Sequence, residues 1–487
     1  MKSWHKMTFF AMIFTLSMVA HADTPNENTA GIKIYGNEIH DAAQQISTLY
    51  NSDFVMFLSN QHPNKDMTLG KLAQTCINYT KHNANITRDT CVDLLNKIAK
   101  HINTPQEPTV DSKFTIITTD DTTHFSFDIY AAGNFTVDCG DGQNVQHISK
   151  QKLDKQTITC DYSTRGSYTI KLGGTATKYS DAADTTPNTI SFSANTNIKK
   201  IEGCLGCIFP TLTDGTQPDF YMTFYGCTNL EGPIPGTLFN GISGEPIMRM
   251  FAYTFADCKK LTGPIPTELF SGISGTPADA MFLGTFAGCE SLNGSIPQTL
   301  FSDIDGQPAP SMFAYTFYGC KNLAGQIPDN LFANIHGTPA EAMFMGTFAG
   351  CEKLSGTIPT GLFSGINGQP AKSMFWGTFA YCKNLTGPLP ALFNRINGVP
   401  APSMYKQTFD SCINLNGEIP RDLFGTLNGG AMQGMFEYTF MNDAKLTGTS
   451  LQDLYKQWPD ANELYVGDMY HGATGLSDRA TIPNAWK

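Results

Sequence analysis

The sequence is poor in positive charge. Its 487 residues include 32 Lys and Arg against 43 Asp and Glu, and the formal net charge is -11. No cluster of basic residues interrupts this acidic balance. An acidic chain is repelled by phosphate backbones and by anionic lipid surfaces, so we expect no nucleic-acid partner.

Familiar catalytic motifs are missing as well. The chain has no Gly-x-Ser-x-Gly, no His-Glu-x-x-His and no phosphate-binding Gly-Lys-Thr loop. Its ten histidines are scattered along the chain, and His336 is the only one within the repeated region 219–449. The sequence therefore predicts a protein that is not an enzyme and that uses neither a cofactor nor a metal ion.

Long hydrophobic runs are absent apart from one near the start. Lys2 and Lys6 precede the apolar stretch 7–20, and Ala20-His21-Ala22 fits a small-x-small cleavage site. The stretch is short for a membrane span, so residues 1–22 are predicted to be a cleaved signal peptide rather than an uncleaved anchor. We expect an exported chain without a transmembrane segment, secreted or at the cell surface, with the periplasm as an alternative.

Residues 23–109 are predicted to form a helical N-terminal region. Apolar residues recur there at spacings of three and four, for example in the segment 68–102. Cys76 and Cys91 lie on two neighbouring helical stretches of this region. In an exported protein such a pair predicts a disulfide bond.

Residues 110–188 change to a period of two. Segments such as "KFTIITT" and "HFSFDIY" alternate β-branched or aromatic residues with polar ones, which is typical of a small β-sandwich. Asp138 and Asp141 lie in an Asp-Gly turn, and their turn-forming role is favoured over calcium binding, which needs six or more oxygen ligands.

The segments 137–143, "VDCGDGQ", and 160–172, "CDYSTRGSYTIKL", resemble the PKD-type sandwich that accompanies repeats in bacterial surface proteins. In that family a Trp precedes the Gly-Asp-Gly turn and a His begins the later strand pair. This chain has Cys139 in the Trp position and Cys160 in the His position. The resemblance thus implies that a disulfide bond across the sheets replaces a packed aromatic pair, provided the two positions face each other.

Residues 219–449 repeat. Six cysteines follow one another at intervals of 31 residues, a seventh follows after 30, and in an eighth copy Asp443 takes the cysteine position. Self-similarity at this period predicts a solenoid in which like residues of successive coils stack into columns. The periodic cysteines are Cys227, Cys258, Cys289, Cys320, Cys351, Cys382 and Cys412.

Each copy approximates Met-Phe-x-x-Thr-Phe-x-x-Cys-x-x-Leu-x-Gly-x-Ile-Pro-x-x-Leu-Phe. Its second half resembles the leucine-rich repeat, and its Thr-Phe-x-x-Cys-x-x-Leu portion resembles the BspA-like variety found in bacterial surface proteins. The resemblance implies a leucine-rich-repeat solenoid that binds a protein or a glycan in adhesion. The complete fold expectation is a multidomain chain, with the solenoid of 31-residue repeats preceded by the small β-sandwich and the helical region.

The solenoid needs a cover at each end, because its terminal coils would otherwise expose apolar columns. We expect residues 189–218 to form the N-terminal cap. Residues 450–487 are expected to form the C-terminal cap, where Trp458 and Trp486 close the last hydrophobic layer.

The periodic cysteines are predicted to be buried thiols that fit one inward corner of every coil and bond to neighbouring backbone. Disulfides between coils are the alternative, but seven is an odd number and a bridged column would break the regular step. Cys204 and Cys207 form a Cys-x-x-Cys motif at the entry to the first coil, where a capping disulfide is favoured over a redox centre.

A row of aromatic residues recurs on the repeats. Exposed rings beside neutral polar groups suit a protein or glycan partner, although rings at repeat positions also pack between coils. The candidate ligand-binding residues are Tyr253, Tyr315, Trp376, Tyr381 and Tyr438. The expected function is adhesin-like binding at a host or neighbouring cell surface. A structural spacer or envelope component without a ligand is the main alternative, and a recognition module of a larger enzyme assembly is another.

Overall fold

The computed structural model describes residues 33–34, 67–68, 111–180 and 187–487. The chain divides into two units, Met1–Thr109 and Val110–Lys487. In the first unit, β1 (Lys33–Ile34) and β2 (Met67–Thr68) pair antiparallel. The predicted signal peptide, the rest of the predicted helical region and the expected Cys76–Cys91 disulfide lie outside the described residues.

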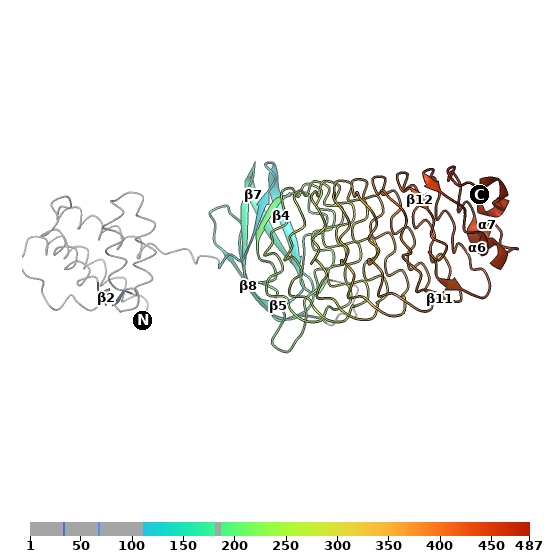
Figure 1. Ribbon diagram of the computed structural model, residues 1–487. Helices are drawn as coiled ribbons and strands as arrows, with labels where there is room; N and C mark the ends of the chain where they lie inside the picture. The colour runs from blue at the N-terminus through green and yellow to red at the C-terminus, as the bar shows by residue number, and fades with distance from the viewer. Residues whose placement is uncertain (1–32, 35–66, 69–110, 181–186) are drawn as a thin grey trace, which may run out of the picture. The chain divides into compact units, whose positions relative to one another are not determined.

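The second unit begins with an antiparallel β-sheet domain (Figure 1). One sheet has the strand order β10-β3-β8-β5-β6 and the other the order β7-β4-β9. The strands are β3 (Phe114–Thr118), β4 (Thr122–Ile129), β5 (Ala132–Asp138), β6 (Gln146–Lys150), β7 (Gln156–Gly166), β8 (Thr169–Lys178), β9 (Ile190–Ser191) and β10 (Ile198–Gly203).

The alternating sequence pattern explains these strands, because successive side chains of a strand point to opposite faces. In β4, Phe125, Phe127 and Ile129 are buried while the residues between them are more exposed. The Cys139–Cys160 disulfide is present and links the end of β5 to β7, so it joins the two sheets.

The Asp-Gly turn after β5 is held by its own carboxylates. Asp138 accepts a hydrogen bond from the backbone N–H of Gly140 at 2.8 Å, and Asp141 accepts one from Gln143 at 2.9 Å. Both acidic side chains therefore close tight turns of the kind that Asp commonly forms.

The β-sheet domain shares its sheets and core with the segment expected to cap the solenoid. β9 and β10 come from residues 189–218, and they pair with β4 and β3 respectively. Phe192, just after β9, stacks on Phe224 of the first coil with ring centroids 5.4 Å apart. The sheet domain thus closes the N-terminal end of the solenoid directly, through one continuous hydrophobic core.

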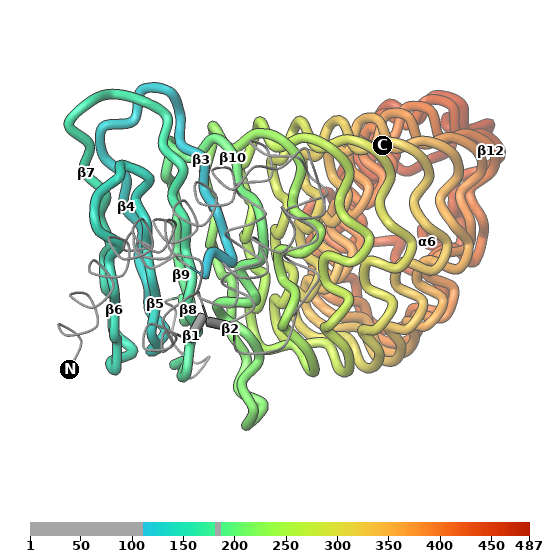
Figure 2. The backbone as a smooth tube through the Cα atoms, turned by 90° about the vertical axis from the view of Figure 1, so that its left-hand side faces the viewer, coloured from blue at the N-terminus to red at the C-terminus, as the bar shows by residue number. Residues whose placement is uncertain are grey.

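The solenoid follows as a stack of coils whose buried residues recur about every 31 positions (Figure 2). We number the coils 1 to 8 by the buried threonine of their Thr-Phe motif. These threonines are Thr223, Thr254, Thr285, Thr316, Thr347, Thr378, Thr408 and Thr439.

Aromatic columns form the interior of this stack. In the column after the threonines, Phe255, Phe286 and Phe317 lie in parallel with centroids 5.8 and 5.9 Å apart. A second column contains Phe251 and Phe282, and a third, containing Phe270, packs between them at tilted angles. Equivalent rings are buried against one another from coil to coil, so burial of apolar surface drives the stacking.

In the Met-Phe-x-x-Thr-Phe-x-x-Cys segment, successive backbone N–H groups alternate between an acceptor in the next coil and an acceptor in their own coil. The N–H of Tyr253 donates to Leu283 in the next coil, whereas the N–H of Thr254 donates to Phe251 three residues back. Each coil is therefore a ribbon of tight turns whose remaining amides tie it to the following coil. Elsewhere the coils touch through short parallel pairings, such as Gly294 with Leu323.

Near the C-terminal end these pairings lengthen into two-residue parallel strands. β11 (Asn397–Gly398) pairs with β13 (Thr426–Leu427), and β12 (Gly417–Glu418) pairs with β14 (Leu446–Thr447).

Short helices cover the last coil: α6 (Gln452–Gln457), α7 (Glu463–Val466), η2 (Arg479–Thr481) and η3 (Asn484–Trp486). Trp458 and Trp486 are buried against Phe436 of coil 8, as expected of a cap. The Trp458 indole N–H also donates to the backbone oxygen of Gly429 at 2.9 Å. The described part of the stack is thus closed at both ends.

Candidate functional site

The outward positions of each coil lie on either side of its buried Thr-Phe pair. The residue just before the threonine, and the residue three positions after it, adopt a positive φ in every coil. Glycine fills many of these positions, for example Gly288, Gly319 and Gly350, because it adopts this conformation without strain. Tyr315 (φ 55°) and Tyr381 (φ 60°) adopt it with a bulky side chain. The repeat imposes this conformation on every coil, and it is strained at any residue that has a side chain.

An open groove of about 610 Å³ runs across coils 2 to 7 on this surface. Tyr315 and Tyr318 line it on coil 4, and Trp376 and Tyr381 line it on coil 6. Tyr318 and Tyr381 are 49% and 45% exposed, which makes them two of the seven large hydrophobic side chains that are exposed in the described part of the chain. Exposed rings that share one groove are available to a partner.

Small residues separate the two aromatic pairs. On coil 5 the groove is lined by Gly346, Ala349 and Gly350. Within the first pair, the rings of Tyr315 and Tyr318 meet edge to face at 5.6 Å. The groove thus presents one aromatic pair, a flat interval of one coil, and a second aromatic pair.

Charged side chains line the groove on coils 2 to 6, and their sign alternates from Glu290 on coil 3 to Lys383 on coil 6. Lys321 lies 2.8 Å from Glu290 of the preceding coil, and Lys383 lies 3.3 Å from Glu352. Side-chain hydrogen bonding to Lys321 lowers the pKa of Glu290. These solvent-exposed pairs add little stability, but they leave the groove nearly neutral while offering both donors and acceptors.

Beyond coil 6, Lys406 lies close to the rings of both Trp376 and Tyr438. The Lys406 ammonium lies 5.2 Å from the Trp376 ring centroid and 5.8 Å from the Tyr438 ring centroid, and it pairs with Glu437 at 2.6 Å. The indole N–H of Trp376 donates to Gln407 at 3.0 Å. These contacts fix the Trp376 ring and occupy the space between it and Tyr438.

At coil 7, the buried Asp410 is hydrogen-bonded to Gln407, which lines the groove. Asp410 accepts hydrogen bonds from Gln407 at 3.2 Å and from Ser411 at 2.8 Å. Burial raises the pKa of the Asp410 carboxyl. The pKa of the Tyr381 phenol is in turn raised, chiefly by the neighbouring Asp410 charge. Tyr381 therefore stays a neutral hydrogen-bonding group at ordinary pH.

Three of the five aromatic residues predicted to bind a ligand line this groove: Tyr315, Trp376 and Tyr381. Tyr253 instead meets Tyr225 edge to face at 6.5 Å, and Tyr438 lies beyond Lys406. Neither of these two tyrosines lines the groove.

Further lining residues were not among the sequence-derived candidates. They are Tyr318, Gln407 and a Glu-Lys ladder made of Glu290, Lys321, Glu352 and Lys383. The alternation of charge just after the cysteine, Lys259, Glu290, Lys321, Glu352 and Lys383, is the sequence signal that identifies the ladder.

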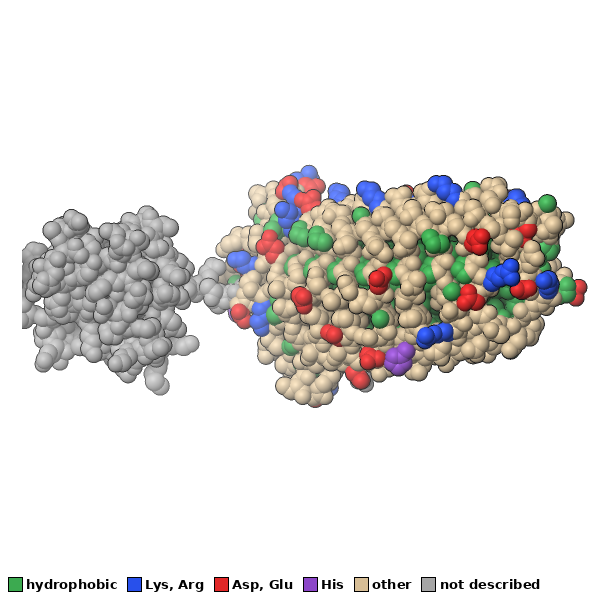
Figure 3. Space-filling view, in the orientation of Figure 1, with side chains coloured by type: hydrophobic (Ala, Val, Ile, Leu, Met, Phe, Trp, Pro, Cys, Tyr) green, Lys and Arg blue, Asp and Glu red, His purple; other side chains and the backbone are tan. Residues whose placement is uncertain are grey.

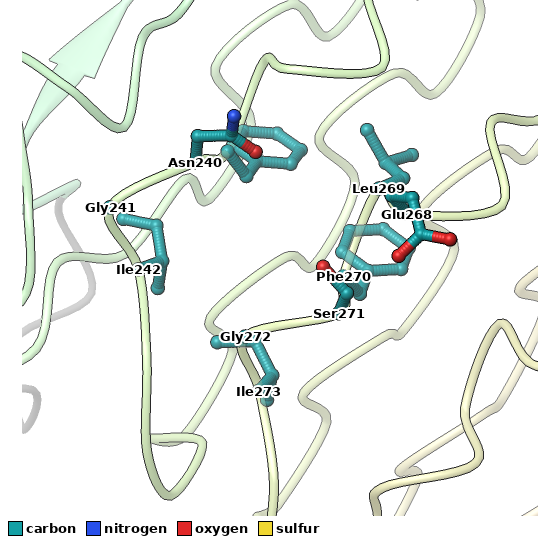
Figure 4. A pocket seen from close by; sticks show the side chains of 10 residues that line it. Asn240, Gly241, Ile242, Glu268, Leu269, Phe270, Ser271, Gly272 and Ile273 are labelled. Atoms are coloured by element: carbon teal, nitrogen blue, oxygen red, sulfur yellow. The ribbon is translucent and has the colours of Figure 1, made fainter.

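A second, smaller cavity of about 160 Å³ lies between the Leu-Phe turns of coils 1 and 2, at residues 239–242 and 268–273 (Figure 4). Glu268 is the only charged side chain among its lining residues. The cavity is a gap between two stacked turns and brings no reactive groups together.

The seven periodic cysteines are buried and unbridged. The thiol of Cys289 donates to the carbonyl of Phe255 at 3.0 Å, and that of Cys320 donates to Phe286 at 3.1 Å. Burial raises the pKa of the Cys227 thiol to about 12, so these groups remain protonated and unreactive. Cys204 and Cys207 form a disulfide at the entry to the solenoid.

Within the described residues, no group of three His, Cys, Asp or Glu side chains is placed to hold a metal ion, and no helix is long and apolar enough to cross a membrane. The face of the solenoid shown in Figure 3 carries few charged side chains and a band of hydrophobic ones across the coils. Comparison with protein families, with curated proteins and with solved structures gives no match.

Proposed function

We propose that this protein is an exported, adhesin-like binding protein that holds an extended protein or glycan in the aromatic groove of its solenoid. The observation that carries this proposal is the groove itself, which two aromatic pairs on coils 4 and 6 line on either side of an interval of small residues on coil 5. Rings of this kind supply much of the binding energy at recognition surfaces.

The placement on a solenoid supports binding of a long partner. Each coil repeats the same outward positions about one strand spacing, or roughly 4.8 Å, from its neighbour. A groove over coils 2 to 7 therefore offers a linear array of contacts. Weak contacts along such an array add up when one polymer touches several of them.

The sequence resemblances bear on location. The repeats resemble BspA-like leucine-rich repeats, and the sheet domain resembles the PKD type, both of which occur in bacterial surface proteins. The signal peptide expected at residues 1–22 agrees with export. We therefore place the protein at the cell surface or in the secreted fraction.

The alternative role of a ligand-free spacer or envelope component has less support. End-to-end assembly of solenoids needs an open terminal coil. Here the sheet domain covers coil 1, and Trp458 and Trp486 cover coil 8. A spacer also has no use for exposed rings such as Tyr318 and Tyr381.

Binding of the purified full-length chain to arrays of immobilised glycans and extracellular proteins tests the proposal. We expect binding that is lost in the double variant Tyr318→Ala/Tyr381→Ala. The matched control is Val399→Ala/Met432→Ala, which removes two exposed hydrophobic side chains outside the groove and is expected to bind normally. Equal loss in both variants, or no binding by the wild type, would contradict the proposal.

A further inference from the structure

We propose that the polymer held by the groove is a neutral, β-linked polysaccharide that lies along the solenoid axis and stacks every second sugar on an aromatic pair. This inference rests on the binding function proposed above and names the ligand class.

The spacing of the aromatic pairs carries the first step. The pairs Tyr315/Tyr318 and Trp376/Tyr381 lie two coils apart, and two coil steps amount to about 10 Å. The ligand must therefore present an equivalent apolar face at intervals of about two coil steps. In an extended β-linked glycan, neighbouring sugars are turned by about half a rotation, so the same face recurs at every second unit over a comparable length.

A peptide in β-conformation does not meet this requirement. Its side chains return to the same face every two residues, or about 6.6 Å, which is shorter than the interval between the pairs. The groove also offers no sheet edge to such a strand, because the amides of its coils are already bonded to the next coil or to their own turns.

A polyproline II peptide repeats every three residues, or about 9.3 Å, and thus matches the spacing. The hydrogen-bonding groups decide against it. A proline-rich backbone offers mainly carbonyl acceptors and few N–H donors, so it provides little to hydrogen-bond with the carboxylates Glu290 and Glu352 of the groove. Sugar hydroxyls both donate and accept, which suits the alternating carboxylates and ammonium groups of the ladder.

The charge of the groove points to an uncharged ligand. Its charged lining residues are Asp257, Glu290 and Glu352 against Lys321 and Lys383, a sum of 2 - 3 = -1. Two ion pairs neutralise four of these five groups. A sulfated or uronic-acid polymer would have to break these pairs without finding a free cation in their place.

Titration calorimetry of the full-length protein tests the proposal with defined oligomers. The probes are β-1,4-linked glucose oligomers of two to six units and the hexamer of β-1,4-linked N-acetylglucosamine. We expect the affinity of the glucose oligomers to rise about tenfold between two and four units, because the chain first reaches both aromatic pairs within this range. Tyr318→Ala is expected to lower hexamer affinity about tenfold and to change dimer affinity less than twofold.

A blocking variant gives a second readout. Ala349 on coil 5 occupies the same repeat position as Tyr318 on coil 4, and its methyl group is buried among the lining residues of the groove, so the larger ring of Ala349→Tyr is expected to fill the interval between the pairs. We expect Ala349→Tyr to abolish hexamer binding. Met441→Tyr makes the corresponding change on coil 8, outside the groove, and is expected to bind as the wild type does.

Two comparison ligands separate the outcomes. The α-1,4-linked glucose hexamer curves and is expected to bind at least tenfold more weakly than the β-linked hexamers. If a proline decamer binds the groove and no β-linked hexamer does, this inference is overturned while the proposed function stands. If neither these probes nor the arrays yield a ligand, both fail. Equal binding of α- and β-linked hexamers also overturns the inference.

Discussion

The phenol ring of Tyr315 lies over Gly346 of the next coil, and a Cβ atom added to Gly346 would come within 2.5 Å of the ring's Cδ1. Tyr253 and Gly284 repeat this relationship at 2.6 Å. A tyrosine at this position therefore needs a residue without a side chain in the following coil. This packing requirement accounts for the two-coil spacing of Tyr253 and Tyr315, and it keeps coil 5 of the groove free of a ring at this position.

Replacing Gly346 by Ala tests this packing. The residue has φ 60°, so alanine there is strained by about 1–2 kcal/mol, and the contact with Tyr315 adds to the cost. We expect Gly346→Ala to lower the free energy of unfolding by at least 1 kcal/mol in urea titrations. Gly430→Ala, at a glycine with open space and no positive φ, is the control and should change it little. A second change, Tyr315→Ala, should recover part of the loss, and no recovery would argue against the ring contact.

The two disulfides are expected to differ in their contribution. Cys139 and Cys160 are 21 residues apart in sequence, whereas Cys204 and Cys207 are 3 apart. Since a cross-link restricts the unfolded chain more when its loop is longer, replacing the first pair by Ser should cost about 3 kcal/mol and the second about 1.5 kcal/mol. Thermal unfolding of the two double variants measures the difference. The reverse order would show that native contacts, rather than loop entropy, decide the effect.

Asp443 makes stability depend on pH. It takes the cysteine position of coil 8, is fully buried, and has no hydrogen-bond partner for either carboxyl oxygen among the described residues. Burial, with a smaller effect of the Asp410 charge, raises the pKa of Asp443 well above its ordinary value. The folded state then holds a proton that the unfolded state releases above about pH 4, so this contribution to stability falls as pH rises from there through the raised pKa.

Asp443→Cys restores the column residue and removes this dependence. We expect the variant to be more stable than the wild type by about 1–3 kcal/mol at pH 8, with a smaller gain at pH 4. Urea unfolding at several pH values measures the difference. Asp453→Asn, which changes an exposed carboxylate, is the control, and its free energy of unfolding should depend on pH as that of the wild type does. A gain that does not grow with pH would mean that Asp443 is not the titrating group.

Much of the solenoid follows from the sequence, because identical residues at a fixed interval can all be buried in the same way only by stacking. Met281, Phe282 and Phe286 are each fully buried at the core positions that the repeat predicts. The alternation of the sheet domain was equally readable, since Phe125 and Phe127 share one buried face. The boundary near residue 188 was harder to predict from the sequence, because a strand as short as β9 carries almost no periodicity.

The groove was only partly predictable. Trp376 precedes its threonine by two residues and Tyr315 by one, yet both line the same groove. The tight turns decide where each ring projects, and the repeat pattern does not contain that information. Lys406 was also unforeseen, because its contact with the Trp376 ring depends on how a long side chain folds back over the preceding coil.

Thiol labelling checks the interior of the coils. The seven periodic cysteines are buried and hydrogen-bonded, and burial raises their pKa values, so they should resist alkylation in the native protein. After unfolding in urea without reductant, all seven should react, as mapped by mass spectrometry of the peptides. Cys139, Cys160, Cys204 and Cys207 should stay unlabelled until a reductant is added. Rapid labelling of Cys320 in the native state would contradict the packing of the column.

Tyr381 offers a test that separates function from stability. At its position coils 3, 4 and 5 have Gly288, Gly319 and Gly350, whereas Tyr381 holds φ 60° with its ring 45% exposed. Tyr381→Gly relieves about 1–2 kcal/mol of backbone strain, offset by up to 1 kcal/mol of added chain entropy in the unfolded state. We expect Tyr381→Gly to be more stable than Tyr381→Ala by about 1 kcal/mol, and both variants to lose binding equally. Unfolding and ligand titrations on the same samples measure both effects. If the glycine variant is the less stable of the two, the strain assigned to this tyrosine is absent; if either variant binds as the wild type does, Tyr381 has no part in recognition.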